Sequence, residues 1–223
     1  MFEAPKSLLF ITDFMAYFMN SFRRTLNSNA KSAVALGGRE LYMQIINSKN
    51  FRLENTCVSI GKFDGLHAGH QELFIEMEKY RGRYPLVIFS FDMLNESEKI
   101  YSSEKKITYL NTRGYDYLIN YPFDEETRNM EPEIFVEKVL VDALGIKVLT
   151  VGDNFRFGHN RAGDTKLLEK LSMKYSFKLN VVPCLKFENE NISSSRIREL
   201  LGSGDNETAE RLLQSNFWSV TKN

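Results

Sequence analysis

The chain has 223 residues, of which 43% are hydrophobic and 26% charged, so it is long enough for one large or two small globular domains. Its 29 basic residues balance 29 acidic residues, which excludes bulk electrostatic attraction to nucleic acid or to an anionic membrane. Any phosphate-bearing ligand must therefore bind at a local site. The two cysteines, Cys57 and Cys184, lie far apart in apolar segments and suit a reducing compartment, so we expect a cytoplasmic protein.

The first 42 residues precede the regular pattern, and we treat them as an extension of uncertain structure before a domain over 43–223. Their apolar stretch, LLFITDFMAYFM, contains Asp13 and is much shorter than the roughly 20 apolar residues of a membrane-spanning helix. The NSFRRTL that follows is a poor cleavage site for a secretory signal. We therefore expect neither a membrane anchor nor a secretory signal.

From Thr56 onward, apolar runs that predict strands alternate with segments of helical periodicity. We expect strands at 57–60, 85–91, 115–121, 146–151 and 177–182. We expect helices at 70–81, 104–112, 132–144, 165–174, 194–201 and 206–213. This alternation predicts an α/β fold, a Rossmann-like doubly wound five-stranded parallel sheet in the order 3-2-1-4-5, followed by two C-terminal helices.

Two glycine-rich turns, 61–69 and 152–163, follow the first and fourth of these strands. Ligands of open α/β sheets bind beyond the carboxyl ends of the strands, where the strand order switches. In the order 3-2-1-4-5 those two strands are neighbours at the switch. Both turns would then face one crevice.

The first turn, GKFDGLHAGH, holds two of the three histidines in the chain, His67 and His70. Its glycines let backbone amides approach a ligand, and the helix that follows aims its free N–H groups at the same place. Two imidazoles there can stabilise the charge that grows on phosphorus during nucleophilic attack. The alternative is that one histidine caps the helix and the other packs in the core.

Two further stretches are suited to holding a nucleotide. In NISSSRIREL, serines cap a helix whose first turn carries Arg196 and Arg198, which form a good cradle for outer phosphates. Taken alone, this stretch is better explained as a capped surface helix with solvated arginines. In GDNFRFGHNRAGD, Asn154 can contact an adenine or ribose edge, while Phe155 and Phe157 either stack on a ring or close the core. No Cys/His or carboxylate spacing indicates a metal site, so magnesium, if used, would come with a triphosphate.

In this order, GKFDGLHAGH, VGDNFRFG and ISSSRIRELLGSGD resemble the FMN adenylyltransferase module of bacterial FAD synthetases, members of the HxGH nucleotidyltransferase superfamily. The resemblance runs from about Met43 to Phe217. It implies transfer of AMP from ATP to FMN, giving FAD and pyrophosphate, with Mg2+ on the ATP phosphates and no covalent enzyme intermediate. Small-molecule substrates are the expected partners, with no nucleic acid, no membrane and no obligate protein partner.

The resemblance also implies a role for each matching residue. His67, His70 and Arg198 correspond to the catalytic, phosphate-binding groups. Two residues correspond to the flavin site, Phe91 and Asp92. The residues expected to bind ATP or to shape its loop are Gly61, Phe63, Asp64, Gly65, Gly69, Asn154, Ser194 and Ser195.

The sequence departs from the family pattern at several places. The second strand runs into SFDMLN and lacks the Pro-His-Pro that usually helps to form the flavin site, and Ser195 replaces a threonine. No riboflavin kinase barrel follows, so riboflavin kinase activity is not expected. Two other functions stay open: nucleotidyl transfer to another phosphate-bearing substrate, and a non-catalytic flavin- or nucleotide-binding module. For 1–42, the alternatives are a misplaced start codon before Met43 and an extension that packs Phe10, Phe14 and Phe18 on the domain.

Overall fold

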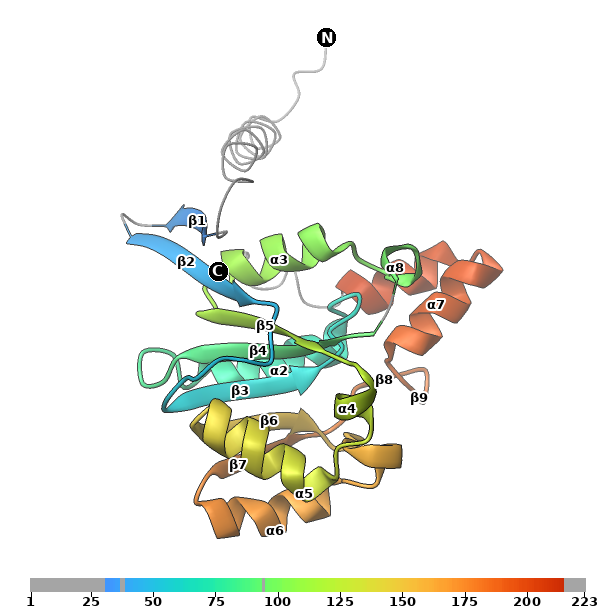
Figure 1. Ribbon diagram of the computed structural model, residues 1–223. Coiled ribbons are helices and arrows are strands. Elements are labelled where there is room, and N and C mark those ends of the chain that lie inside the picture. The colour runs from blue at the N-terminus through green and yellow to red at the C-terminus, as the bar shows by residue number, and fades with distance from the viewer. Residues whose placement is uncertain (1–30, 37–38, 94, 215–223) are drawn as a thin grey trace.

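The computed structural model describes residues 31–36, 39–93 and 95–214, with the backbone alone over 31–36 and 39–42 and at 92 and 214 (Figure 1). Among them a seven-stranded sheet has the order β1-β2-β5-β4-β3-β6-β7, in which β1 is antiparallel to β2 and the other pairs are parallel. Its strands are β1 (Lys31–Leu36), β2 (Arg39–Ile46), β3 (Thr56–Gly61), β4 (Leu86–Asp92), β5 (Tyr117–Pro122), β6 (Ile146–Gly152) and β7 (Lys178–Val182).

Helices connect these strands and follow the last one. They are α2 (Ala68–Glu78), α3 (Ser103–Thr112), α4 (Glu125–Arg128), α5 (Pro132–Ile134), α6 (Thr165–Tyr175), α7 (Ser194–Ser203) and α8 (Asn206–Gln214). Three further helical segments are the 3-10 turns η1 (Glu96–Glu98) and η3 (His159–Arg161) and the π-helical η2 (Phe135–Ala143). A small hairpin of β8 (Lys186–Phe187) and β9 (Glu190–Asn191) precedes α7.

Side chains of the central strands alternate between two hydrophobic cores, one on each face of the sheet. Val58 of β3 and Phe89 of β4 pack with η2 and α6 on one face. Cys57 and Ile88, their neighbours in sequence, pack with α2 and α3 on the other. Both faces are covered, as in doubly wound α/β proteins, which explains the nearly continuous apolar runs in the sequence.

The five predicted strands are neighbours in the predicted order, as β5-β4-β3-β6-β7, but the predicted total of five strands is wrong. The strands β1 and β2 extend the sheet beyond β5, and β2 pairs in parallel with β5 through Gln44 and Tyr117. These two strands lie where no alternation of strand and helix had begun, so nothing in the sequence pattern indicated them. The strand β2 runs across the predicted domain boundary between residues 42 and 43, and the division into an extension and a domain stays a prediction. The residues Phe10, Phe14 and Phe18 lie outside the described part of the chain.

The two predicted C-terminal helices are confirmed as α7 and α8, which contact each other beyond the carboxyl ends of the central strands (Figure 1). The predicted helix at 132–144 is present, but only its first turn is α-helical and the rest is π-helical. No helix in the described part of the chain has both the length and the apolar character needed to span a membrane.

Candidate active site

The turn after β3 is a tight, left-handed reversal that leads directly into α2. Phe63, Gly65 and Leu66 have positive φ angles of 49°, 77° and 46°, a conformation that is uncommon for residues other than glycine. The Gln71 side chain is buried and its Nε2 donates a hydrogen bond of 2.7 Å to the Leu66 carbonyl oxygen. This bond holds the last left-handed residue of the turn, so His67 enters the helix N-cap in a fixed position.

The two imidazoles lie one upon the other at the start of α2. Their ring centroids are 3.8 Å apart and the planes differ by 20°. His67 is 6% exposed, and the Phe63 ring packs 5.2 Å from the centroid of His70. Gly69 leaves room for this stack, because a Cβ there would lie 3.3 Å from the His67 ring.

Burial keeps both imidazoles neutral at physiological pH. It lowers the pKa of His67 to about 4. The pKa of His70 also falls well below its usual value, through burial first and then through the positive charges of His67 and Lys106. The Nδ1 atoms of both rings are buried and have no hydrogen-bond partner among the described residues. Neutral imidazoles still donate hydrogen bonds, so a ring nitrogen that faces the cleft can donate to a phosphate oxygen without the ring being charged.

The tip of α7 is tied to the opening turn by Asp64, whose side chain is nearly inaccessible. The Ser194 hydroxyl donates a hydrogen bond of 2.8 Å to the Asp64 carbonyl oxygen. Arg198 Nη1 lies 3.5 Å from Asp64 Oδ2 and 3.3 Å from the Ser194 carbonyl oxygen, while one third of its side chain stays exposed. The Ser193 hydroxyl caps the helix by accepting from the Arg196 amide. The guanidinium is thereby fixed at the helix tip with part of it free to contact a ligand.

These elements surround one cleft of about 280 Å3, which we call the nucleotide cleft. Eight predicted site residues line it: Gly61, His67, Gly69, His70, Asn154, Ser194, Ser195 and Arg198. Phe63, Asp64 and Gly65 are buried behind its wall and shape the turn. The sequence did not indicate the segment after β7, which supplies Pro183, Cys184 and Leu185 to the cleft.

The second glycine-rich turn faces the first because β3 and β6 are paired, as predicted. Asn154 is exposed and lines the cleft. The two aromatics that the sequence left open take different places. Phe157 is 5% exposed and belongs to the core, whereas Phe155 stacks on it at 5.6 Å and faces the cleft.

A second cavity of about 320 Å3, which we call the apolar cavity, adjoins the nucleotide cleft. The two share Gly61, Lys62, Asn154 and Phe155. Five phenylalanines contribute to the wall of the apolar cavity: Phe91, Phe123, Phe135, Phe155 and Phe157. Phe91, predicted for the flavin site, therefore lines an aromatic cavity, whereas the side chain of Asp92 at the end of β4 lies outside what the structure describes.

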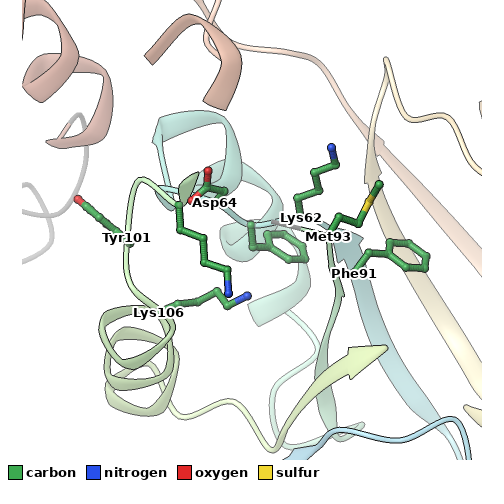
Figure 2. Close-up of a pocket in the computed structure, with 8 residues that line it drawn as sticks. Lys62, Asp64, Phe91, Met93, Tyr101 and Lys106 are labelled. Carbon is green, nitrogen blue, oxygen red and sulfur yellow. The ribbon is translucent and has the colours of Figure 1, made fainter. Parts of the chain in front are cut away.

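A third, much smaller cavity of about 20 Å3 lies under the opening turn, and we call it the lysine pocket (Figure 2). Its lining residues are Lys62, Phe63, Asp64, Phe91, Met93, Lys99, Tyr101 and Lys106. Figure 2 shows Lys106 reaching from α3 toward the space beneath Asp64. Nothing in the sequence pattern indicated this pocket. Over the described ranges no group of three His, Cys, Asp or Glu side chains could hold a metal ion.

A parallel sheet with two glycine-rich turns and a helix tip around one cleft defines an α/β protein with a phosphate-binding geometry at its switch point. Comparison with known families narrows this class. A model of the FAD synthetase family matches residues 49–196, and the chain belongs to that family.

Two proteins with similar sequences support the assignment of the chain to this family. The bifunctional riboflavin kinase/FMN adenylyltransferase of Buchnera aphidicola subsp. Schizaphis graminum is 32% identical over 174 residues, covering 73% of this chain and 56% of that protein. The Escherichia coli K12 protein of the same name is 31% identical over 176 residues, covering 74% of this chain and 56% of that protein. The chain thus spans a little over half the length of these relatives.

Among solved structures, one described as a macrolide-efflux protein from Streptococcus pneumoniae superimposes with a TM-score of 0.67. The superposition covers 77% of this chain and 62% of that chain, at 24% sequence identity. At this identity the likeness shows the shared fold and nothing about activity.

Proposed function

We propose that the protein transfers the adenylyl group of ATP to FMN, giving FAD and pyrophosphate. The observation that carries the proposal is the junction of the two cavities at Gly61 and Lys62, beside the stacked histidines. A transfer between two nucleotides needs two adjoining sites that meet where the phosphates react. The family assignment and the names of the relatives favour ATP and FMN as the two substrates.

The two cavities differ in character as these substrates require. The nucleotide cleft offers imidazoles, hydroxyls and a guanidinium, which suit a triphosphate. The aromatic wall of the apolar cavity suits a flat, largely apolar ring system, because aromatic rings stack with offset or edge-to-face geometry. In it Phe123 lies 5.6 Å from Phe91, and Phe91 lies 6.0 Å from Phe135, between ring centroids.

In the proposed reaction, an oxygen of the FMN phosphate forms a bond to the α-phosphorus of ATP. The bond between that phosphorus and the bridging oxygen to the β-phosphorus breaks, and its electron pair leaves with pyrophosphate. The attacking phosphate is an anion, so no base is needed to activate it. Catalysis then consists of positioning the two phosphates and stabilising the charge of the transition state.

Most of the predicted residues that line the two cavities have a place in this scheme. His67 and His70 donate hydrogen bonds to the reacting α-phosphate as neutral imidazoles, and Arg198 with Ser194 and Ser195 holds the outer phosphates. Asn154 contacts the adenosine side of ATP, whereas Phe91 borders the flavin. Two carboxylates, Asp64 and Glu96, are already engaged in hydrogen bonds or ion pairs, so we propose that Mg2+ enters with the ATP phosphates.

The test is to incubate the purified chain with ATP, Mg2+ and FMN and to measure FAD and pyrophosphate together. Formation of both in equal amounts supports the proposal. Turnover of pantetheine phosphate or nicotinamide mononucleotide without turnover of FMN would instead favour another nucleotidyl transfer, which the altered SFDMLN segment motivates. Binding of ATP and FMN without pyrophosphate release would indicate a non-catalytic binding module. Riboflavin kinase activity is not part of the proposal.

A further inference from the structure

Lys62 is the residue at which the cavities described above meet. It follows the last residue of β3 and lines the nucleotide cleft, the apolar cavity and the lysine pocket. The two larger cavities also share Gly61, Asn154 and Phe155, none of which carries a charge. Over the described side chains, Lys62 is therefore the only charged group that borders both proposed substrate sites.

The backbone of Lys62 is held in place, whereas its side chain is available to a ligand. The Lys62 carbonyl oxygen accepts a hydrogen bond of 3.1 Å from Ser90 Oγ. Phe63, the next residue, is 0% exposed and has a left-handed φ of 49°, so packing fixes the chain at this point. Lys62 itself is exposed, and no described side chain forms a hydrogen bond or ion pair with its ammonium group. Figure 2 shows the side chain extending away from Lys106.

The proposed reaction brings two anions together at this junction. The phosphate of FMN carries a charge of about −1.5 to −2 at pH 7, and it must approach the anionic α-phosphate of ATP. Like charges in contact repel each other unless a cation lies between them. Burial lowers the pKa values of His67 and His70, so both imidazoles are neutral at this pH. They donate hydrogen bonds to the phosphates but supply no positive charge.

The other cations of the two cavities lie elsewhere on the walls. Arg198 lines the nucleotide cleft but not the apolar cavity, and it pairs with Asp64 at 3.5 Å. Arg156 and Arg161 line the apolar cavity but not the nucleotide cleft. No aspartate or glutamate is among the described side chains that line either cavity. Among the described groups of the protein, Lys62 is therefore the one placed to offset the repulsion where the phosphates meet.

We propose that Lys62 is a catalytic residue whose ammonium group binds between the two reacting phosphates, that of FMN and the α-phosphate of ATP. The inference rests on the proposed function for the identity of these substrates. Lys62 stays an ammonium ion throughout, since neither the bond that forms at phosphorus nor the bond that breaks needs a proton from it. Its charge lowers the repulsion between the bound substrates and stabilises the transferred group in the transition state. A compact charge on a flexible stem suits this position.

The first measurement tests whether FMN and an ATP analogue bind independently of each other. The Kd of FMN is determined calorimetrically with Mg2+, without and with saturating α,β-methylene-ATP, which cannot release pyrophosphate. In Lys62→Met, the analogue should weaken FMN by about tenfold more than in the wild-type chain, a size typical of coupling between two sites. Riboflavin has the same ring system and lacks the phosphate, so its Kd should show no such change.

The second measurement is the rate of FAD formation at saturating ATP and FMN. Lys62→Met should be about tenfold to a hundredfold slower, less than the loss of a buried oxyanion donor because Lys62 is partly solvated. Lys62→Arg keeps the charge and should retain most of the rate and of the coupling. Thermal unfolding of both variants should match the wild-type chain, because the side chain is exposed.

Two control variants separate the junction from other positive charges. Arg161→Met removes a cation that lines the apolar cavity alone of the two, so any change in FMN affinity should be the same with and without the analogue. Lys170→Met, at an exposed position on α6, should match the wild-type chain in both measurements.

Several outcomes would overturn the inference. One is a coupling in Lys62→Met equal to that of the wild-type chain. Another is equal weakening of FMN and riboflavin, which would show a contact with the ring system. Weaker binding of the analogue with unchanged coupling would place Lys62 at ATP alone. An arginine variant as slow as the methionine variant would show that the site does not require the charge.

This test is separate from the test of the proposed function. A wild-type chain that forms FAD while the coupling in Lys62→Met stays unchanged would contradict the role of Lys62 alone. A wild-type chain that forms no FAD would contradict the proposed function, whereas the coupling between FMN and the analogue would still report on Lys62.

Discussion

The Ser194 hydroxyl donates a hydrogen bond of 2.8 Å to the carbonyl oxygen of Asp64, joining residues 130 positions apart in the sequence. Through this bond the tip of α7 is attached to the turn that carries His67 and His70. The imidazoles and the guanidinium of Arg198 therefore face the same cleft, although they belong to opposite ends of the domain.

Ser194→Ala should separate the tip of α7 from the turn without breaking the fold. Loss of one partly buried hydrogen bond should lower the free energy of unfolding by about 1 kcal/mol and should raise the KM for ATP. Urea unfolding and steady-state kinetics check the two effects. Ser203→Ala is the control, since the Ser203 hydroxyl donates to the Leu200 carbonyl oxygen at the far end of the same helix. A KM for ATP equal to that of the control would show that this bond does not position the cradle.

His67→Ala should lower turnover by one to several orders of magnitude, because removal of one donor to a transition-state oxyanion has effects of about 100-fold to 1,000-fold in other enzymes. The measurement is the rate of FAD formation, with circular dichroism to verify the fold. His159→Ala is the control, because His159 is 38% exposed and lies near Glu131, away from the cleft lining. An unchanged rate in His67→Ala would remove His67 from the mechanism.

Gly69→Ala should impair turnover more than stability. Gly69 does not have a left-handed φ, and alanine favours helices over glycine by up to about 1 kcal/mol, so the protein should unfold at an equal or higher temperature. The added Cβ would lie 3.3 Å from the His67 ring and must displace it by a few tenths of an ångström. Turnover should therefore fall.

Gly202→Ala is the matched control for this prediction. Nothing lies within 4 Å of a Cβ at Gly202, which is exposed in α7. Its thermal unfolding should shift in the same direction while turnover stays at the wild-type value. If the two variants have the same turnover, the close approach of Gly69 to His67 has no catalytic consequence.

The stability of the unliganded protein should depend on pH through His67. Its pKa is about 4 in the folded state and about 6.5 when unfolded, so between these values the unfolded chain binds a proton that the folded chain does not. The free energy of unfolding should therefore decrease as the pH falls from 6.5 to 4, by on the order of 3 kcal/mol from His67 alone. His70 acts in the same direction.

Urea unfolding at pH 7 and pH 4.5 measures this dependence, and His67→Gln should lose less stability between the two values than the wild-type chain. Equal losses would show that His67 titrates normally in the folded state. The carboxylates with lowered pKa values, such as Asp124 and Glu96, lose their contributions mainly below this window, because their folded pKa values are about 2.

Phe123→Ala should raise the KM for FMN and leave the KM for ATP unchanged. Phe123 lines the apolar cavity and not the nucleotide cleft, and its ring packs against Phe91. Removing an aromatic contact from the flavin wall should weaken FMN by about tenfold. Equal increases in both KM values would argue against separate sites for the two substrates.

The sequence predicted the central part of the sheet because its strands are buried on both faces. Ile60, Val87 and Leu149 are at most 2% exposed. Strands that are buried on both faces have nearly continuous apolar sequences, which can be recognised without a structure. The neighbouring strands β3 and β6 brought the two glycine-rich turns together, as the switch-point rule requires. The convergence of His67 and Asn154 on one cleft followed from that topology alone.

The lysine pocket could not be predicted in this way. Lys99 and Lys106 follow β4 in a polar, irregular segment and a short helix, where lysines are normally solvated. Their burial depends on tertiary contacts, such as the bond from Lys106 to Ser90, that leave no periodic pattern. Phe123 and Met130 of the apolar cavity come from the connection between β5 and α5, which the sequence pattern left unassigned.

The position of β3 in the middle of the sheet has a consequence for local unfolding of the molecule. Its first four residues, Thr56 to Ser59, are fully inaccessible, and parallel partners flank it on both sides. The amide hydrogens of this strand should exchange with solvent only when the whole domain unfolds, whereas those of the exposed β8–β9 hairpin should exchange first. The imidazoles are therefore attached to a strand that should stay closed, whereas the hairpin before α7 belongs to the part of the domain that should open first.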